Sequence, residues 1–270
     1  MKILVFSGGL GNQIFGYAFY RFMKRSFPNQ SINGVYNSMW LHEHNGLEID
    51  KYFDVQLPKS SFKAKVCVVL LFIGKKFGFF THLISMDTRT FTPKAVVSSA
   101  CKMDLKFIPE ERNWIKFKDI TLTNRNFIVL RRIKETQSVF IHIRKGDYYS
   151  VRHIKRLGGT CPVEYYIDAI SYVLSLVYNA VFFVFSDDID WVRKNLNISK
   201  AYFIYWNNGD NSYIDMYLMT QCKYAIIANS TFSYWGAMLG EEKQIITYPK
   251  KWVNPPFKAP NIFPDKWIEI

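Results

Sequence analysis

The sequence of 270 residues has few cysteines and lacks several common binding signatures. Its four cysteines are isolated from one another, with no CxxC pair and no histidine at metal-ligand spacing. This usage indicates reduced thiols in a cytoplasmic protein and argues against a structural zinc site. The phosphate-loop signatures GKS and GKT are absent, and the glycines near the N-terminus do not follow GxGxxG. Neither a P-loop nucleotide site nor a dinucleotide fingerprint is therefore expected.

Long hydrophobic runs are also absent. The most apolar run, VCVVLLFI at 66–73, is too short to span a bilayer, even when it is joined to Phe79 and Phe80. The N-terminus has no small-residue cleavage site, so we interpret it as a first strand and a loop rather than a signal peptide. Two interpretations of residues 64–80 stay open: a core helix, or a helix on a membrane surface flanked by Lys63, Lys65, Lys75 and Lys76.

Acidic residues are outnumbered by basic ones. The chain has 35 Lys and Arg against 22 Asp and Glu, a formal net charge of +13. An anionic partner is expected, which could be a nucleic acid, an anionic membrane surface or a small molecule with phosphates. The basic residues are spread along the chain without an RNA-binding or zinc-finger signature, so we expect no nucleic-acid partner. A hydrophobic share of 49% with 21% charged residues is typical of a globular protein.

The sequence does contain a regular alternation of predicted strands and helices. A buried strand at 2–6, a glycine loop at 8–11 and a helix at about 12–27 open the chain. From residue 138 on, strands are predicted at 138–143, 180–185, 201–205, 224–228 and 244–248, and helices at 163–178, 188–197, 214–222 and 232–240. This alternation predicts a parallel sheet covered by helices on both faces. For residues 29–135 the sequence pattern predicts no firm boundaries of helices or strands.

Polar clusters follow several of these strands. In an open parallel sheet, ligands bind beyond the carboxyl ends of the strands. The candidate residues are Gly9, Gly11 and Asn12 after the first strand; His142, Arg144 and Asp147 after 138–143; Ser186 and Asp187 after 180–185; and Asn229, Ser230, Thr231, Phe232 and Ser233 after 224–228. Taken alone, each cluster also fits a structural role, as a tight turn, a helix cap or a core histidine.

Taken together, an arginine at a strand end and a hydroxyl-rich helix start suit a diphosphate. The guanidinium of Arg144 is a planar fork that can bind two phosphate oxygens at once. The N–H groups at the start of a capped helix also bind phosphate. Asp187 can accept hydrogen bonds from ribose hydroxyls or from a base edge. The charge that opposes a leaving pyrophosphate would then come from the protein.

Five segments carry a family resemblance: GGLGNQIF, FIHIRKGDYY, CPVEYYIDAI, FFVFSDDIDWV and DMYLMTQCKYAIIANSTFSYWGAML occur in this order. The chain resembles the α-1,2-fucosyltransferases of glycosyltransferase family 11, strongly over the first 20 residues and about 138–240, and weakly over 29–130. The resemblance implies an α/β chain with the GT-B fold, in which two Rossmann-like domains enclose the active site in a cleft. We expect an N-terminal acceptor-side domain at 1–135 and a C-terminal GDP-sugar-binding domain at 136–270, whose tail can cross back.

The resemblance also implies a donor and a set of roles. GDP-β-L-fucose would be the donor, and the reaction would invert the configuration at the anomeric carbon to give an α-fucoside. It would need no metal or other cofactor. Arg144 would bind the diphosphate, Asn12 would lie beside the reacting centre, and the Ser230–Phe232 segment would lie at the phosphates. The chain departs from the usual family pattern at Lys145, Gly16 and Tyr234, where Arg, Gln and Trp are usual.

The resulting expectation is transfer of L-fucose to the 2-OH of a terminal galactoside, in surface polysaccharide or O-antigen synthesis. Asp147 is the candidate base, and the alternative is that the leaving phosphate takes the proton. The expected acceptor is a galactose-terminated oligosaccharide, free or linked to a lipid carrier, at the inner face of the cytoplasmic membrane or in the cytoplasm. Two rival hypotheses stay open: a GT-B enzyme with another sugar nucleotide or acceptor hydroxyl, and a non-catalytic basic protein that binds a membrane or RNA.

Overall fold

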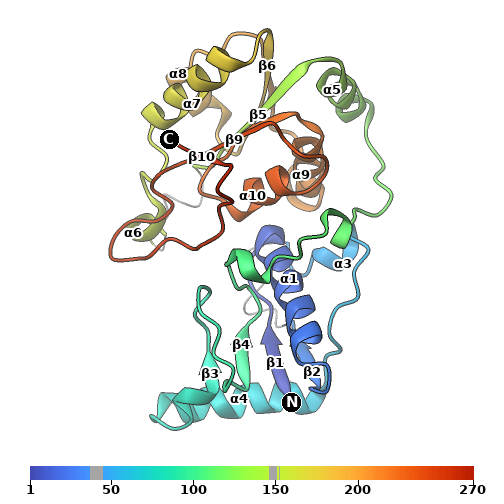
Figure 1. Cartoon of the computed structure of the whole chain (residues 1–270), viewed down its shortest axis with the longest axis vertical. Coiled ribbons are helices and arrows are strands. Elements are labelled where there is room, and N and C mark those ends of the chain that lie inside the picture. The colour runs from blue at the N-terminus through green and yellow to red at the C-terminus, as the bar shows by residue number, and fades with distance from the viewer. Residues whose placement is uncertain (37–44, 146–150, 152) are drawn as a thin grey trace. The chain divides into compact units, whose positions relative to one another are not determined.

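A computed structural model of the chain describes residues 1–36, 45–145, 151 and 153–270. The chain forms two units (Figure 1): Met1–Lys118 with Pro260–Ile262, and Asp119–Ala259 with Phe263–Ile270. The boundary falls after Lys118, earlier than the expected boundary after residue 135. The reason is helix α5 (Asn124–Glu135), which packs against the sheet and a helix of the C-terminal unit.

The N-terminal unit is built on a parallel sheet with the strand order β2-β1-β4-β3. Its strands are β1 (Lys2–Val5), β2 (Ile32–Val35), β3 (Ile84–Ser85) and β4 (Val97–Ser99). Because side chains alternate along a strand, β1 buries apolar residues on both faces. Ile3 and Val5 pack with α4 (Phe62–Lys76), and Leu4 packs with α1 (Leu10–Ser26). The predicted first strand and first helix are confirmed, and the helix begins at Leu10.

The remaining elements of this unit are short. They are α3 (Ile49–Tyr52), η1 (Thr81–Leu83), η2 (Leu105–Phe107) and η3 (Arg112–Trp114). An aromatic cluster lies beside α1, where Phe19 and Phe22 contact the rings of Phe91 and Phe107 edge to face. The tail residue Asn261 joins this unit through a 2.8 Å hydrogen bond from Leu105 N–H to its carbonyl.

The C-terminal unit contains a six-stranded parallel sheet with the order β10-β9-β8-β5-β6-β7. Its strands are β5 (Gln137–Ile143), β6 (Ala180–Ser186), β7 (Ala201–Ile204), β8 (Tyr224–Ile226), β9 (Ile245–Tyr248) and β10 (Ile268–Glu269). The five predicted strands are confirmed. The short β10 was not predicted, because its two residues carry no apolar pattern of their own.

Helices cover both faces of this sheet (Figure 1). The described helices of this unit are α5, α6 (Ile154–Leu157), α7 (Val163–Leu176), α8 (Ile189–Asn195), α9 (Ser212–Gln221), α10 (Thr231–Met238) and the 3-10 turn η5 (Gly209–Asn211). On one face, Val139 and Ile141 pack with α7 and α8. On the other face α5, α9 and α10 pack together against β5 and its neighbours. The chain is therefore α/β, with parallel sheets in both units.

Candidate functional site

The carboxyl end of β5 carries His142, which is buried and faces the start of α10. The centroids of the His142 and Phe232 rings lie 5.9 Å apart. Burial, followed by the nearby charge of Arg144, lowers the pKa of His142 to about 3. Its imidazole is therefore neutral at physiological pH, and its Nδ1 atom is buried without a hydrogen-bond partner among the described residues. His142 is suited to shaping the site and not to supplying a cation.

Arg144 follows β5 directly and is held by Asp187 from the end of β6. Asp187 Oδ2 lies 3.4 Å from Arg144 Nε, and Asp187 Oδ1 accepts a 2.9 Å hydrogen bond from Lys145 N–H. Sequence reasoning suggested Asp187 as a ligand of the ribose or the base. The structure gives it contacts that orient the Arg144 guanidinium, and the Arg144 side chain stays one-third exposed. This edge of the sheet therefore presents an oriented and accessible cation.

The charge of Lys145 lies on the α7 side of the sheet. Its Nζ atom is 3.4 Å from the carbonyl of Cys161 and 3.7 Å from the centroid of the Trp191 ring. Lys145 is buried, so a cation–π contact and a carbonyl oxygen compensate the loss of water around its ammonium group. Where the family usually has a second arginine, this chain thus has a cation packed inside the unit.

The start of α10 provides the second part of the candidate site. Ser230 Oγ caps the helix by accepting a 3.3 Å hydrogen bond from Phe232 N–H. Asn229 is buried, and its Nδ2 donates to Thr160 Oγ1 at 2.6 Å and to Trp252 O at 3.1 Å. The Ser233 hydroxyl is buried as well and donates to backbone carbonyls of its own loop. Thr231 and Phe232 are half-exposed at the helix start.

An acidic pair that sequence reasoning missed follows β6. Asp188 and Asp190 have Asp-x-Asp spacing, and carboxylate oxygens are ligands that divalent cations such as Mg²⁺ prefer. Here Asp188 Oδ1 accepts a 2.9 Å hydrogen bond from Trp191 N–H and caps α8, and the Ser186 hydroxyl accepts from Asp188 N–H at 3.0 Å. Among the residues that the structure describes, no group of three or more His, Cys, Asp or Glu side chains could hold a metal ion.

The glycine loop lies in the N-terminal unit. Gly8 has a φ of 75°, and a Cβ atom there would lie 2.2 Å from Asn12 Nδ2, so the Asn12 amide packs directly over this glycine. Gly9 is the N-cap residue of α1, and Gly11 and Asn12 lie in the first turn. Gly16, a departure from the family pattern, lies against the Phe6 ring inside the unit, and a Cβ atom there would lie 2.9 Å from that ring, so a larger side chain has no space.

Gln13 is a supporting residue that sequence reasoning did not single out. Its Nε2 donates to the carbonyls of Gly8 at 3.0 Å and Gly46 at 2.8 Å, and its Oε1 accepts from Glu48 N–H at 2.8 Å and Ile49 N–H at 3.1 Å. A fully buried glutamine with this set of bonds ties the glycine loop to the start of α3. Its place next to Asn12 in the GNQ sequence was the available signal.

Asp147 lies outside the described residues. Gly9, Gly11 and Asn12 belong to the N-terminal unit, and the other described site residues belong to the C-terminal unit. An active site in a cleft between the two therefore stays a prediction.

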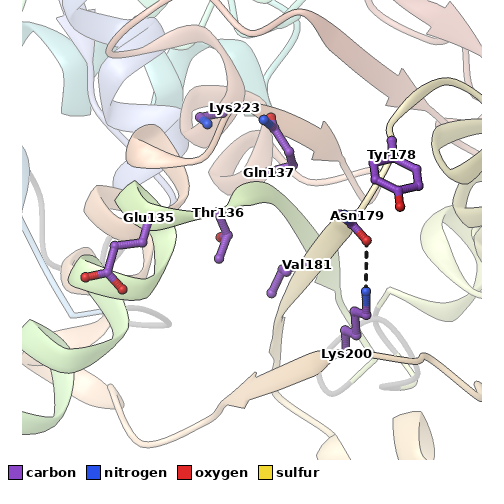
Figure 2. Close-up of a pocket in the computed structure, with 8 residues that line it drawn as sticks. All are labelled: Glu135, Thr136, Gln137, Tyr178, Asn179, Val181, Lys200 and Lys223. Atoms are coloured by element: carbon purple, nitrogen blue, oxygen red, sulfur yellow. Dashed lines mark hydrogen bonds between the residues drawn. The ribbon is translucent and has the colours of Figure 1, made fainter.

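A surface pocket lies at the opposite edge of the C-terminal sheet (Figure 2). Gln137 opens β5 and Val181 is the second residue of β6, so the pocket lies at the amino ends of these strands. Lys200 Nζ donates to Asn179 Oδ1 at 3.2 Å within it. Ligands of parallel sheets bind at the carboxyl ends, and no predicted site residue lines this pocket, so it is not part of the candidate site.

Comparison with known proteins agrees with a sugar-transferring class. The model of the family described as "Glycosyl transferase family 11" matches residues 115–270, which include the Arg144 edge and the start of α10. An Escherichia coli alpha-1,2-colitosyltransferase is 33% identical over 100% of this chain and 99% of its own length. The protein is a glycosyltransferase, and the chain belongs to glycosyltransferase family 11.

Two further relatives match less closely. The E. coli O-antigen biosynthesis glycosyltransferase WbnK is 29% identical over 98% of each chain. A galactoside alpha-(1,2)-fucosyltransferase 1 of Aotus azarae is 28% identical over 53% of this chain and 42% of its own length. As for membrane segments, none of the helices in the described part of the chain has the length and apolarity to cross a bilayer.

Proposed function

We propose that the protein is an inverting galactoside α-1,2-fucosyltransferase that uses GDP-β-L-fucose in surface polysaccharide or O-antigen synthesis. The observation that carries the proposal is Arg144 at the carboxyl edge of the sheet, whose guanidinium is oriented by Asp187 at 3.4 Å and whose side chain is one-third exposed. A diphosphate needs an oriented cation of this kind, and the edge lies within the part of the chain that matches the family. The relatives named for α-1,2 linkages and O-antigen synthesis support the linkage and the pathway.

In the proposed reaction, the acceptor 2-OH attacks the anomeric carbon of fucose while the bond from that carbon to the β-phosphate oxygen breaks. Negative charge grows on the leaving β-phosphate of GDP. Arg144 and the backbone N–H groups at the start of α10 stabilise that charge, in the way that an oxyanion hole stabilises an acyl-transfer intermediate. Attack from the face opposite the phosphate converts the β-linked donor into an α-linked product.

The acceptor hydroxyl must also lose a proton. Asp147 takes it in the simplest version of the reaction, and the leaving phosphate takes it in the alternative version. His142 is not a candidate for this base, because its imidazole is buried and its pKa is about 3. Asn12 orients the acceptor hydroxyl or the fucose in both versions, and Gln13 holds the loop that carries it.

A second donor deserves a direct test. The relative that matches the whole chain at 33% identity is a colitosyltransferase, and colitose is L-fucose without its 3-hydroxyl group. A diphosphate site built on Arg144 would serve both GDP-sugars equally. Discrimination must come from groups that meet the 3-position of the sugar, where a site built to hydrogen-bond a hydroxyl rejects the deoxy sugar strongly.

The test supplies the purified protein with GDP-fucose, GDP-colitose and UDP-galactose in parallel, with a panel of β-galactosides that includes lipid-linked acceptors. Mass spectrometry reads sugar transfer, and NMR of the product reads the linkage and the anomeric configuration. An α-1,2-fucoside product supports the proposal. Transfer of colitose alone would show that the donor is GDP-colitose and not GDP-fucose. If no sugar is transferred and GDP leaves the melting temperature unchanged, the proposal of a GDP-sugar donor is refuted.

A further inference from the structure

Helix α4 carries more apolar surface than the N-terminal unit buries. Its inner side packs on the sheet through Ala64 and Val68, which join a core cluster with Ile3 and Val5. Its outer side leaves five large apolar residues in solvent: Phe62 (81% exposed), Val66 (38%), Val69 (55%), Leu70 (62%) and Ile73 (51%). Isolated exposed apolar side chains are common on proteins, but a contiguous group of this kind marks an interaction surface.

These five residues form one face, which we call the outer face of α4. At about 100° per residue, their positions on the helix fall within about 100° of arc. The aromatic turn after the helix extends this face. Phe77, Phe79 and Phe80 are each more than half exposed, and the Phe80 ring folds back to within 2.9 Å of where a Cβ atom of Gly74 would lie. The helix itself is anchored through Ser61, which caps it and donates a 2.9 Å hydrogen bond to Asn33 Oδ1.

Lysines border the outer face, and acidic residues are absent from its sequence. Residues 55–86 contain five Lys and no Asp or Glu. Helical geometry places Lys63 at one edge of the outer face and Lys65 and Lys76 at the other, and all three are exposed. Long lysine side chains can lay their methylene groups along an apolar surface while the ammonium groups reach outward to anions.

This pattern matches the surface of an anionic bilayer. An apolar stripe edged by lysines is the composition of helices that lie in the plane of the membrane interface. A second copy of the chain fits less well, because two identical faces edged by lysines would bring like charges together across a two-fold axis. With 15 residues, α4 is too short to cross a membrane and suits contact with one leaflet.

We propose that the outer face of α4 and its aromatic turn bind the surface of a membrane that contains anionic phospholipid. The helix lies parallel to the bilayer with its apolar residues among the acyl chains and its lysines at the phosphates. This contact goes beyond the proposed function and does not depend on it, because no candidate donor residue lies on α4. It would hold the enzyme at the surface where lipid-linked acceptors are found.

The experiment uses flotation of the full-length protein with vesicles of phosphatidylcholine, with or without about 30% phosphatidylglycerol, at low and at physiological salt. One variant removes apolar contact (Leu70→Gln with Ile73→Gln), and a second removes charge (Lys63, Lys65, Lys75 and Lys76→Gln). The matched control for apolar residues is Leu174→Gln with Leu176→Gln, two exposed leucines of α7. The matched control for charge replaces four exposed lysines of the C-terminal unit, Lys194, Lys250, Lys251 and Lys258.

The wild type should float with anionic vesicles and much less with neutral ones. Because each lysine near an anionic surface contributes about 1 kcal/mol, the charge variant should bind at least about tenfold more weakly. The apolar variant should also bind the vesicles about tenfold more weakly or worse, since two side chains that would be buried in the bilayer become polar. Both controls should bind like the wild type, and both α4 variants should keep the wild-type melting temperature and the wild-type activity on a soluble acceptor.

Three results would overturn the proposal. The wild type could fail to bind anionic vesicles at low salt, or the control variants could lose as much binding as the α4 variants. In sedimentation velocity, the wild type could instead self-associate through a contact that the Leu70→Gln and Ile73→Gln changes abolish, while vesicle binding stays unaffected. That last result would assign the outer face to a second copy of the chain.

Discussion

Replacement of Arg144 tests the chemistry of the candidate site. Arg144→Ala removes the cation that Asp187 orients at the carboxyl edge of β5. Loss of one preorganised donor to the charge of a transition state lowers turnover by about 10²–10³, or about 2.7–4 kcal/mol. Arg144→Lys should recover little, because an ammonium group cannot keep the Asp187 contact and also offer a two-pronged donor to a diphosphate. The assay is steady-state transfer from GDP-fucose to a soluble galactoside.

Arg132→Ala is the matched control. Arg132 lies in the last turn of α5, is about half exposed and pairs with Glu135 at 3.8 Å. Exposed pairs of this kind contribute about 0–1 kcal/mol to stability, so this variant should keep its turnover and nearly all its stability. All variants must show the wild-type circular dichroism spectrum and melting temperature. Near wild-type turnover by a folded Arg144→Lys would refute the diphosphate fork, and the site would then have to be rebuilt around other residues.

Three further predictions follow from the same edge of the sheet. Asp187→Asn should keep the hydrogen bond from Lys145 N–H but lose the charge that orients Arg144, so kcat/KM should fall by about tenfold to a hundredfold; unchanged kinetics would leave Asp187 without a positioning role. Transfer should survive EDTA, because Arg144 supplies the positive charge, and complete loss with rescue by Mn²⁺ would count decisively against the GT-B assignment and this metal-free site. Burial lowers the pKa of His142 to about 3, so its contribution to stability is complete above about pH 6.5 and is lost as the pH falls toward 3. The free energies of unfolding of the wild type and His142→Asn can be compared by urea unfolding at pH 7.5 and pH 5. The difference between the two proteins should change by up to about 1.4 kcal/mol per pH unit below 6.5. A difference that stays constant with pH would contradict a neutral buried imidazole.

The sequence predicts the C-terminal unit well because its strands are apolar and separated by amphipathic helices. The run at 138–143 is buried on both faces, so it reads as a central strand without any tertiary information. The N-terminal unit gives weaker signals. Its strands β3 and β4 have two and three residues, and α5 was not predicted because its last turns are rich in Arg and Lys. That missed helix is the reason why the boundary was expected after residue 135.

The candidate site is predicted by residue type more reliably than by role. Arg144 and Ser230 could be found because strand ends and helix caps have recognisable chemistry. The contacts of Asp187 and Asn229 could not be predicted, because each side chain bonds to a partner far away in the sequence, such as Cys161, which is 68 residues from Asn229. The sequence left open whether the apolar run of α4 is a core helix or a membrane-surface helix. One side of the helix packs in the core and the other side is exposed, and membrane contact stays a proposal.

The most direct test of the central claim compares the binding of GDP and GMP by calorimetry. The two nucleotides differ only by the β-phosphate, which the Arg144 edge is proposed to bind. The wild type should bind GDP about tenfold to a hundredfold more tightly than GMP, because hydrogen bonds to charged groups contribute about 1.5–3 kcal/mol. In Arg144→Ala this ratio should fall close to one, while the affinity for GMP stays near that of the wild type. An Arg144→Ala protein that keeps the wild-type ratio of GDP to GMP affinity would contradict the account.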